Sequence, residues 1–318
     1  YDGKMYVSDF VNLDWGGRSL GGRIFSLFDP QHVASNSAKQ TQQLIREGLS
    51  KRSADELVAL LSHADMRVRQ RAQFELANRG EASAEKLHAV AADRTASTVT
   101  RLHSVWGLGQ IANRRPEVLT PLLAQLEEGD EIVRGQIIKV LGDRRVTDAA
   151  PTLLKRLKEE SSRIRFFAAL ALGKIAAAEP LVPIGARRGD TVFPTNSSLG
   201  PIPRTPSELK RGTINLGLLE LLRDNADADP YLRHAAVMAL TWIGDLEFLQ
   251  SFATDRSVAV RRGVLLVKRR TADPRIEQFL NDEDWTIATE AARVINDVPI
   301  EVSQPALARK MAQLTTST

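Results

Sequence analysis

The sequence has no cysteine and few aromatic residues. Among its 318 residues none is cysteine and 5% are aromatic, which excludes disulfides, CxxC metal sites and thiol chemistry. No apolar run approaches the ~20 residues that cross a bilayer, and we find no signal-peptide pattern. The net charge of +4 permits an acidic partner without requiring one. Alanine and leucine dominate what remains, as expected where helices pack closely on helices.

The sequence does contain an internal repeat, which is the strongest structural signal in it. An arginine recurs after 32, 33, 31, 68 and 28 residues, and the register continues 27 residues later at Ala288. The repeating arginines are Arg69, Arg101, Arg134, Arg165, Arg233 and Arg261.

Four residues before each of these positions lies an Asp or Ser, which are good helix N-caps because their side-chain oxygens accept hydrogen bonds from first-turn N–H groups. The predicted caps are Asp65, Ser97, Asp130, Ser161, Asp229, Ser257 and Asp284. Mostly apolar or small residues occupy positions −1, +3 and +7 relative to the anchor, which is the spacing of one buried helix face. A helix is therefore predicted to begin after each cap.

A second amphipathic segment precedes each of these helices, for example "SADELVALLSHA" and "EASAEKLHAVAAD". A helix pair of ~30 residues cannot bury its apolar face alone and must stack on its neighbours. The sequence therefore predicts an all-α fold, an α-solenoid or superhelix of about seven helix pairs. Gly109, Gly142 and Gly173 follow the +7 leucine, where the missing Cβ lets a neighbouring helix approach closely.

Three of the predicted second helices, "DMRVRQRAQFELANRG", "DEIVRGQIIKVLGD" and "DPYLRHAAVMALTWIG", resemble HEAT repeats. The resemblance covers roughly residues 53–299. In that family the anchor arginine often pairs with an acidic residue of an adjacent repeat and forms a ladder. The resemblance implies that the six arginines form a structural ladder, which should stop at Ala288.

The N-terminal runs "DGKMYVSDF" and "GGRIFSLFDP" are rich in β-formers and flank a glycine-rich stretch, so they predict a short β-hairpin. The pattern resembles the closing strands of the β-propeller in sorbosone/glucose-dehydrogenase-like quinoproteins. In planctomycete-type bacteria the propeller is followed by HEAT repeats and often by cytochrome c. Since the chain begins at Tyr1 and an isolated hairpin is marginal in water, we expect a piece of a longer protein.

The quinoprotein resemblance implies cofactors and a location. The pyrroloquinoline quinone (PQQ), calcium and haem c would belong to domains of the parent protein outside this chain, and we expect no cofactor or metal in the chain itself. The expected partners are the adjacent propeller and cytochrome c domains or another protein. The expected location is periplasmic or secreted, with the cytoplasm as the alternative.

The chain divides into six expected segments. They are the closing propeller strands at 1–31, a connecting helix at 32–52, repeats one to four at 53–179, a proline-rich inserted loop at 180–212, repeats five to seven at 213–299, and a shortened C-terminal helix or linker at 300–318.

The inserted loop has two interpretations. It is either an insertion that the solenoid rim tolerates at little cost, or a docking segment for an acidic or anionic partner. The docking residues would be Arg187, Arg188, Arg204, Lys210 and Arg211.

We predict no catalytic residues. The histidines are scattered and lack ligand spacing, which favours structural roles. "DNADADPYLRH" lacks the glycine and the glutamate of a calcium loop. "GGRSLGGR" matches neither of the two phosphate-binding patterns, G-x-x-x-x-G-K-[ST] and G-x-G-x-x-G. The function predicted is a non-catalytic scaffold or protein-interaction module of a larger redox protein.

Two other functions remain open on the same scaffold. "RSVAVRRGVLLVKRRT" carries six basic and no acidic residues, which would suit a nucleic-acid-binding solenoid similar in outline to the HEAT-like alkylpurine DNA glycosylases. It lacks interleaved aromatics for base stacking. The second alternative is an enzyme of the phycobilin-lyase HEAT type, for which the sequence offers no catalytic motif.

Overall fold

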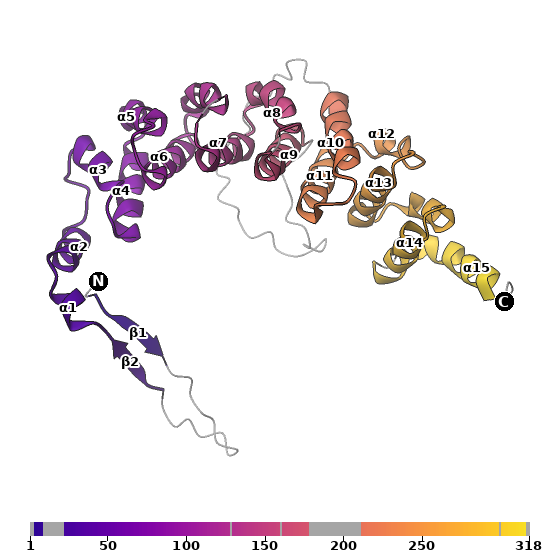
Figure 1. The fold of residues 1–318 in the computed structure, drawn as a ribbon, viewed down its shortest axis with the longest axis horizontal. Helices are drawn as coiled ribbons and strands as arrows, with labels where there is room; N and C mark the ends of the chain where they lie inside the picture. Colours follow the sequence, from indigo (N-terminus) through magenta and orange to yellow (C-terminus); the bar gives the residue numbers. More distant parts are fainter. Residues whose placement is uncertain are drawn as a thin grey trace. The chain divides into compact units, whose positions relative to one another are not determined.

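The computed structural model describes residues 3–8, 22–127, 129–159, 161–177, 211–298 and 300–315, and most of these residues are helical (Figure 1). The chain divides into two compact units, residues 1–111 and residues 112–318. We describe each unit by itself.

The predicted hairpin is present at the start of the first unit. Strands β1 (Met5–Ser8) and β2 (Ile24–Leu27) pair antiparallel, with Met5 opposite Leu27 and Ser8 opposite Ile24. Both strands are exposed along their whole length. A two-stranded sheet with neither face covered is marginal on its own in water.

Helices α1 (Pro30–Ala34) and α2 (Asn36–Glu47) follow the hairpin. The sequence predicted one connecting helix here, but Ser35 divides it. The Ser35 N–H donates to the carbonyl of His32, and the Ser35 hydroxyl accepts from the N–H of Ala38. Ser35 therefore ends one helix and caps the next, which is a local competition that periodicity does not reveal.

Two helix pairs follow in the described part of the first unit. They are α3 (Ala54–Leu60) with α4 (Met66–Arg79), and α5 (Glu81–Ala92) with α6 (Thr98–Ile111). The second helices α4 and α6 pack on each other.

The described residues of the second unit form five further pairs and a C-terminal helix. They are η1 (Pro116–Leu126) with α7 (Glu131–Asp143), η2 (Thr147–Ala149) and α8 (Ala150–Arg156) with α9 (Ser162–Ala176), α10 (Arg211–Asn225) with α11 (Pro230–Ile243), α12 (Leu246–Gln250) with α13 (Val258–Thr271), η3 (Pro274–Asn281) with α14 (Trp285–Asp297), and then η4 (Glu301–Ser303) with α15 (Gln304–Thr315).

The second helices of this unit pack in chain order, α7 on α9, α9 on α11, α11 on α13 and α13 on α14. The stack is therefore continuous from α9 to α11, although the proline-rich segment separates them in sequence. Residues 180–210 of that segment lie outside the described residues.

The apolar residues at the predicted repeat positions form the core of the stack. Val133, Ile137 and Leu141 of α7 are buried, at −1, +3 and +7 from Arg134. Helices α7, α9 and α11 approach closely where two glycines lie. A Cβ added at Gly142 would be 2.6 Å from the Cα of Ala171, and one at Gly173 would be 2.5 Å from the Cα of Ala239.

The fold is thus an all-α solenoid of helix pairs with an N-terminal β-hairpin, as the sequence predicted. Among the helices that the structure describes, none combines the length and apolar character that crossing a bilayer requires.

Candidate interaction surface

Each of the seven predicted capping residues accepts a hydrogen bond from a first-turn N–H. The four aspartates accept from the N–H two residues later, and the three serines from the N–H three residues later. The pairs are Asp65 with Arg67 (2.8 Å), Asp130 with Ile132 (2.7 Å), Asp229 with Tyr231 (2.8 Å), Asp284 with Thr286 (2.9 Å), Ser97 with Thr100 (3.2 Å), Ser161 with Ile164 (3.3 Å) and Ser257 with Val260 (3.4 Å). Caps of this kind each stabilise a helix by about 1 kcal/mol.

In the described part of the chain, two of the anchor arginines reach an acidic residue of the following repeat. The Nη2 atom of Arg134 lies 3.6 Å from Glu159 Oε2. The Arg261 guanidinium is bidentate to Asp282, with Nε–Oδ2 and Nη2–Oδ1 distances of 2.8 and 2.9 Å. Arg233 instead pairs with Asp227 of its own repeat at 3.0 Å.

The remaining anchor arginines donate to neutral groups. Arg69 donates to the carbonyls of His63 and Ala64 and, through Nε, to Nε2 of His103 in the next repeat. Arg101 donates to the Ala91 carbonyl at 2.9 Å. Arg165 donates to the hydroxyl of Ser162 at 3.2 Å. These arginines bind turns and neighbouring helices, so among the residues that the structure describes the acid-paired ladder is interrupted.

The residue six positions before the next anchor does not by itself decide whether an acid pair forms, because Asp227 and Asp255 hold that position opposite Arg165 and Arg233 but pair with other arginines. That position holds Glu159 opposite Arg134 and Asp282 opposite Arg261, and both pairs form. It holds the uncharged Thr95 opposite Arg69. The position alone therefore does not predict which anchor arginines form acid pairs.

Most basic residues of helix α13 form ion pairs with carboxylates of the same chain. Arg261 binds Asp282, Arg262 binds Asp227 at 3.3 Å, Lys268 binds Asp273 at 3.0 Å and Arg269 binds Glu290 at 3.1 Å. Arg256 and Arg270 are exposed. Because nucleic-acid binding depends on arginines and lysines free to meet phosphates, these pairs disfavour the nucleic-acid alternative.

Lys268 occupies a +7 position, where five other repeats have leucine, and it is 1% exposed. Its Nζ donates to Gln250 Oε1 at 2.8 Å as well as to Asp273. Burial lowers the pKa of Lys268, and the Asp273 carboxylate opposes that shift. Burial alone would raise the pKa of Asp273, but hydrogen bonds from Arg275 and Lys268 hold it at about 2. The charged pair is therefore a structural element of the core.

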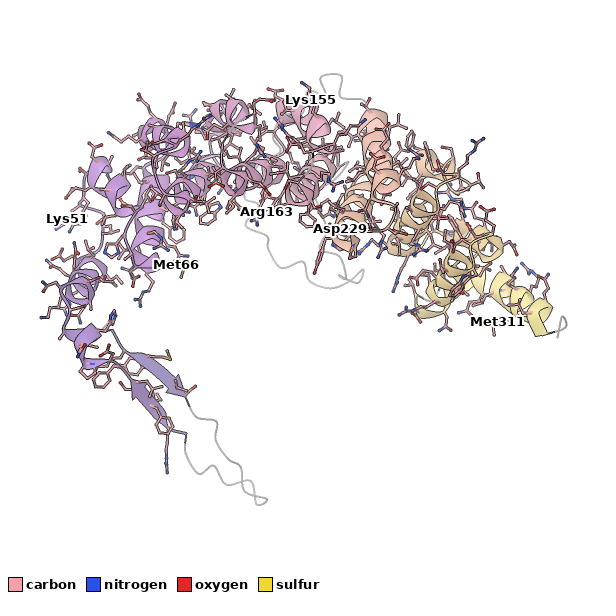
Figure 2. All side chains as sticks on the ribbon, viewed as in Figure 1. Lys51, Met66, Lys155, Arg163, Asp229 and Met311 are labelled. Carbon is pink, nitrogen blue, oxygen red and sulfur yellow. The ribbon has the colours of Figure 1, made fainter. Side chains whose placement is uncertain are left out.

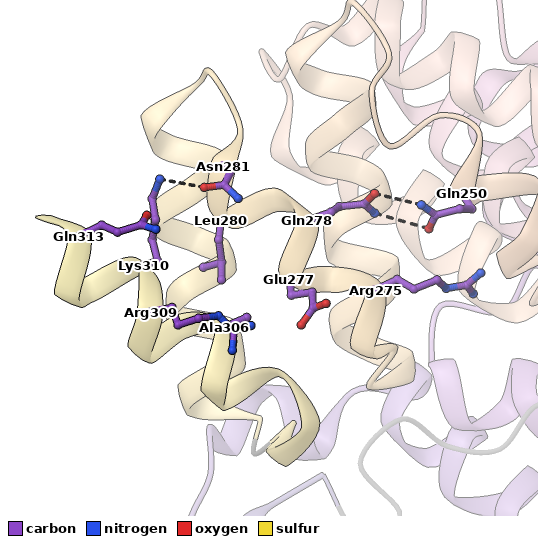
Figure 3. A pocket seen from close by; sticks show the side chains of 10 residues that line it. All are labelled: Gln250, Arg275, Glu277, Gln278, Leu280, Asn281, Ala306, Arg309, Lys310 and Gln313. Atoms are coloured by element: carbon purple, nitrogen blue, oxygen red, sulfur yellow. Dashed lines mark hydrogen bonds between the residues drawn. The ribbon is translucent and has the colours of Figure 1, made fainter.

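A polar hollow of about 400 Å³ opens between η3 and α15 (Figure 3). The amides of Gln250 and Gln278 bind each other across one wall, and Lys310 donates to Asn281 at 2.9 Å. Its lining combines amides with charged groups of both signs. The lining residues are Gln250, Arg275, Glu277, Gln278, Leu280, Asn281, Ala306, Arg309, Lys310 and Gln313. This hollow offers no activated nucleophile, and the described residues contain no group of His, Asp and Glu able to hold a metal ion.

His103 belongs to α6, contacts α4 and is buried. Its Nδ1 is 2.7 Å from Gln73 Oε1, and its Nε2 accepts from Arg69 at 3.2 Å. Nε2 can accept only if the ring is neutral with its proton on Nδ1. Burial and then the Arg69 charge lower the pKa of His103 to about 4. The ring is thus a neutral packing element between two repeats.

Three large apolar side chains are exposed in the first turns of α11, α13 and α14. Tyr231, Val258 and Trp285 are 74%, 36% and 75% exposed. They lie two or three residues before the anchor in three consecutive repeats, and we call them the first-turn stripe. Figure 2 labels Asp229, the cap that begins α11 beside this stripe. Periodicity did not single them out, because they lie off the −1, +3, +7 face.

The predicted docking residues fall mostly on the segment that the structure does not describe. Arg187, Arg188, Arg204 and Lys210 lie outside the described residues, and Arg211 is the exposed first residue of α10. Their role stays a prediction.

A family model described as HEAT repeats matches residues 119–184, which span the third and fourth predicted pairs. No curated protein matches the chain. The match and the observed helix pairs agree on a HEAT-like, armadillo-like α-solenoid.

Several solved structures resemble the chain. The YibA protein of Escherichia coli is 18% identical, with a TM-score of 0.44 over 87% of this chain and 97% of that one. A designed armadillo repeat protein in complex with a (KR)4 peptide is 17% identical, with a TM-score of 0.36 over 69% and 99%. The complex of CpcE and CpcF of phycocyanin lyase from Nostoc sp. is 17% identical, with a TM-score of 0.31 over 77% and 94%. All three TM-scores lie below 0.5, so the functions of these proteins say nothing about this one.

Proposed function

We propose that the chain is a non-catalytic HEAT-like scaffold that binds another protein or an adjacent domain. The observation that carries this proposal is that the charged side chains are mostly paired within the chain while large apolar side chains are exposed. The charged residues of the repeats largely bind one another or the backbone, as Arg261 with Asp282 and Lys268 with Asp273 do. Large apolar residues such as Tyr231 and Trp285 are exposed on rigid first turns. Exposed aromatics on a rigid framework are typical of binding surfaces.

The parent protein that we propose is an exported, quinoprotein-dehydrogenase-like redox protein. The exposed apolar residues of the hairpin, among them Met5, Ile24 and Leu27, support this proposal because a sheet of two strands gains stability by pairing further. In this account β1 and β2 complete a propeller blade, and the solenoid separates the propeller from an electron-transfer domain. The location would be periplasmic or extracellular.

Purification of the full-length natural protein tests this parentage. We expect bound quinone and calcium by mass spectrometry and metal analysis, and the absorption bands of haem c. The chain of 318 residues prepared alone should show no dye-linked dehydrogenase activity when PQQ and calcium are added. A full-length protein free of quinone, calcium and haem would contradict the redox parentage, and activity of the chain alone would contradict the scaffold role.

A further inference from the structure

The first-turn stripe joins three neighbouring helices. Tyr231, Val258 and Trp285 lie at nearly the same register in α11, α13 and α14, which pack in that order. Because packed helix axes lie about 8–10 Å apart, the stripe extends over roughly 20 Å. An extended peptide covers that length with about six residues.

A hydrogen-bonded brace fixes the three first turns. The Arg262 guanidinium on α13 binds Asp227, before α11, through Nε at 3.3 Å, and Thr286 of α14 through Nη2 at 2.5 Å. Arg233 binds the other oxygen of Asp227 at 3.0 Å. The caps Asp229, Ser257 and Asp284 hold each turn. A surface fixed in this way loses little conformational entropy when a partner binds.

The charge around the stripe is negative. Residues 223–233, 254–262 and 281–286 contain seven carboxylates against five arginines. Four of the arginines are tied to carboxylates, Arg223 to Asp255, Arg233 and Arg262 to Asp227, and Arg261 to Asp282. Glu283, two residues before Trp285, has a side chain 84% exposed, and its Oε1 lies 3.2 Å from Nη2 of Arg261. Carboxylates and the exposed π faces of Trp and Tyr both favour a cation over an anion.

We propose that the first-turn stripe binds a short extended segment of a partner protein in which lysine or arginine alternates with apolar residues. The apolar side chains would cover Val258 and the aromatic rings, while the cations would lie over the faces of Trp285 and Tyr231 and near Glu283. This inference rests on the proposed scaffold function and names its partner class.

Fluorescence polarisation with the complete chain tests the proposal. The probe is the fluorescein-labelled peptide Ala-Lys-Leu-Arg-Leu-Lys-Ala, and its counterpart is Ala-Glu-Leu-Asp-Leu-Glu-Ala. The test variant is Tyr231→Ala with Trp285→Ala. The matched control is Val302→Ala with Leu314→Ala, two other exposed apolar residues of the same unit. Unchanged thermal unfolding of both variants verifies the fold.

We expect the basic peptide to bind the unaltered chain and the control, and to lose affinity at least about tenfold in the test variant. The acidic peptide should bind at least about tenfold more weakly than the basic one. Equal binding of the basic peptide to all three proteins would overturn the assignment of the stripe. Equal binding of the acidic peptide would overturn the partner class while the scaffold proposal stands. Binding of neither peptide would overturn this inference alone, because cofactor content and enzyme assays test the proposed function separately.

Discussion

Single residues distinguish one repeat of this stack from another, and Lys268 is the clearest case. Five repeats have leucine at the +7 position, whereas the sixth has a buried lysine bound to Asp273 and Gln250. A buried ion pair is weak evidence of stability, because desolvation offsets much of the Coulomb attraction. It is, however, costly to break from one side.

Asp273→Asn should therefore destabilise the protein much more than Lys268→Leu. Replacing Asp273 leaves a buried ammonium without its counter-ion, which costs about 3–5 kcal/mol. Lys268→Leu returns the position to the leucine of its neighbours, but it leaves Asp273 with Arg275 as its remaining charged partner, so we expect a change of at most about 1 kcal/mol. Urea unfolding measures both free energies. Equal losses in the two variants would show that the pair does not act as described.

His103 should make stability depend on pH. Its pKa is about 4 in the folded protein against an ordinary 6.5, so between these values the unfolded chain binds a proton that the folded chain does not. Stability from the neutral ring is complete above pH 6.5 and falls as the pH drops toward 4, by about 3 kcal/mol at most. Urea unfolding at pH 7 and pH 4.5, compared with His103→Gln, isolates this contribution. The same pH dependence in His103→Gln would contradict it.

At the scale of elements, the second helix of each pair could be predicted from the sequence and the first helix much less well. Caps such as Asp130 and Asp229 and the −1, +3, +7 spacing specify where a second helix begins and which face it buries. The first helices include η1, which begins at Pro116 and contains Pro121, and η3, which begins at Pro274. Proline removes a backbone hydrogen-bond donor. The apolar periodicity of these segments predicts that they are helical, but not that they are 3₁₀ helices rather than α-helices.

The close approach of α9 and α11 can be tested at Gly173. A Cβ there would meet the Cα of Ala239 at 2.5 Å, so Gly173→Ala should force the helices apart and cost about 1–3 kcal/mol. Gly212→Ala in α10 is the control, since nothing lies within 4 Å of its added Cβ and alanine favours helix by up to about 1 kcal/mol. Thermal unfolding compares the two. A loss in both variants, or in neither, would contradict the packing described.

The surface was less predictable than the fold for a physical reason. Burial imposes a period on the sequence, but exposed residues such as Tyr231 and Trp285 follow none. Pairing also decides which charges remain available. Arg262 resembles its neighbours in sequence, and only its contacts with Asp227 and Thr286 show that it braces the turns.

At the scale of the whole molecule, the hairpin and the solenoid should be energetically separable. Strands β1 and β2 are exposed throughout, and a lone hairpin adds little stability in water. Removing residues 1–28 should leave the unfolding temperatures of the helical units within about 4 °C, because about 1 kcal/mol corresponds to 4–8 °C in a domain the size of the first helical unit and to 2–4 °C in one the size of the second. It should also reduce self-association through the exposed strand edges. Circular dichroism and size-exclusion chromatography measure both, and a large drop in the unfolding temperature would show that the hairpin belongs to the folded core.

Site-specific photo-crosslinking tests the scaffold account most directly. The photoreactive residue p-benzoylphenylalanine replaces Trp285 in one variant of the full-length protein and Val302, equally exposed, in another. After irradiation in the cells that naturally make the protein, mass spectrometry identifies the attached peptide. We predict one protein segment, rich in Lys or Arg and apolar residues, crosslinked at position 285 and absent at position 302. No crosslink at position 285, or the same crosslinks at both positions, would contradict the account.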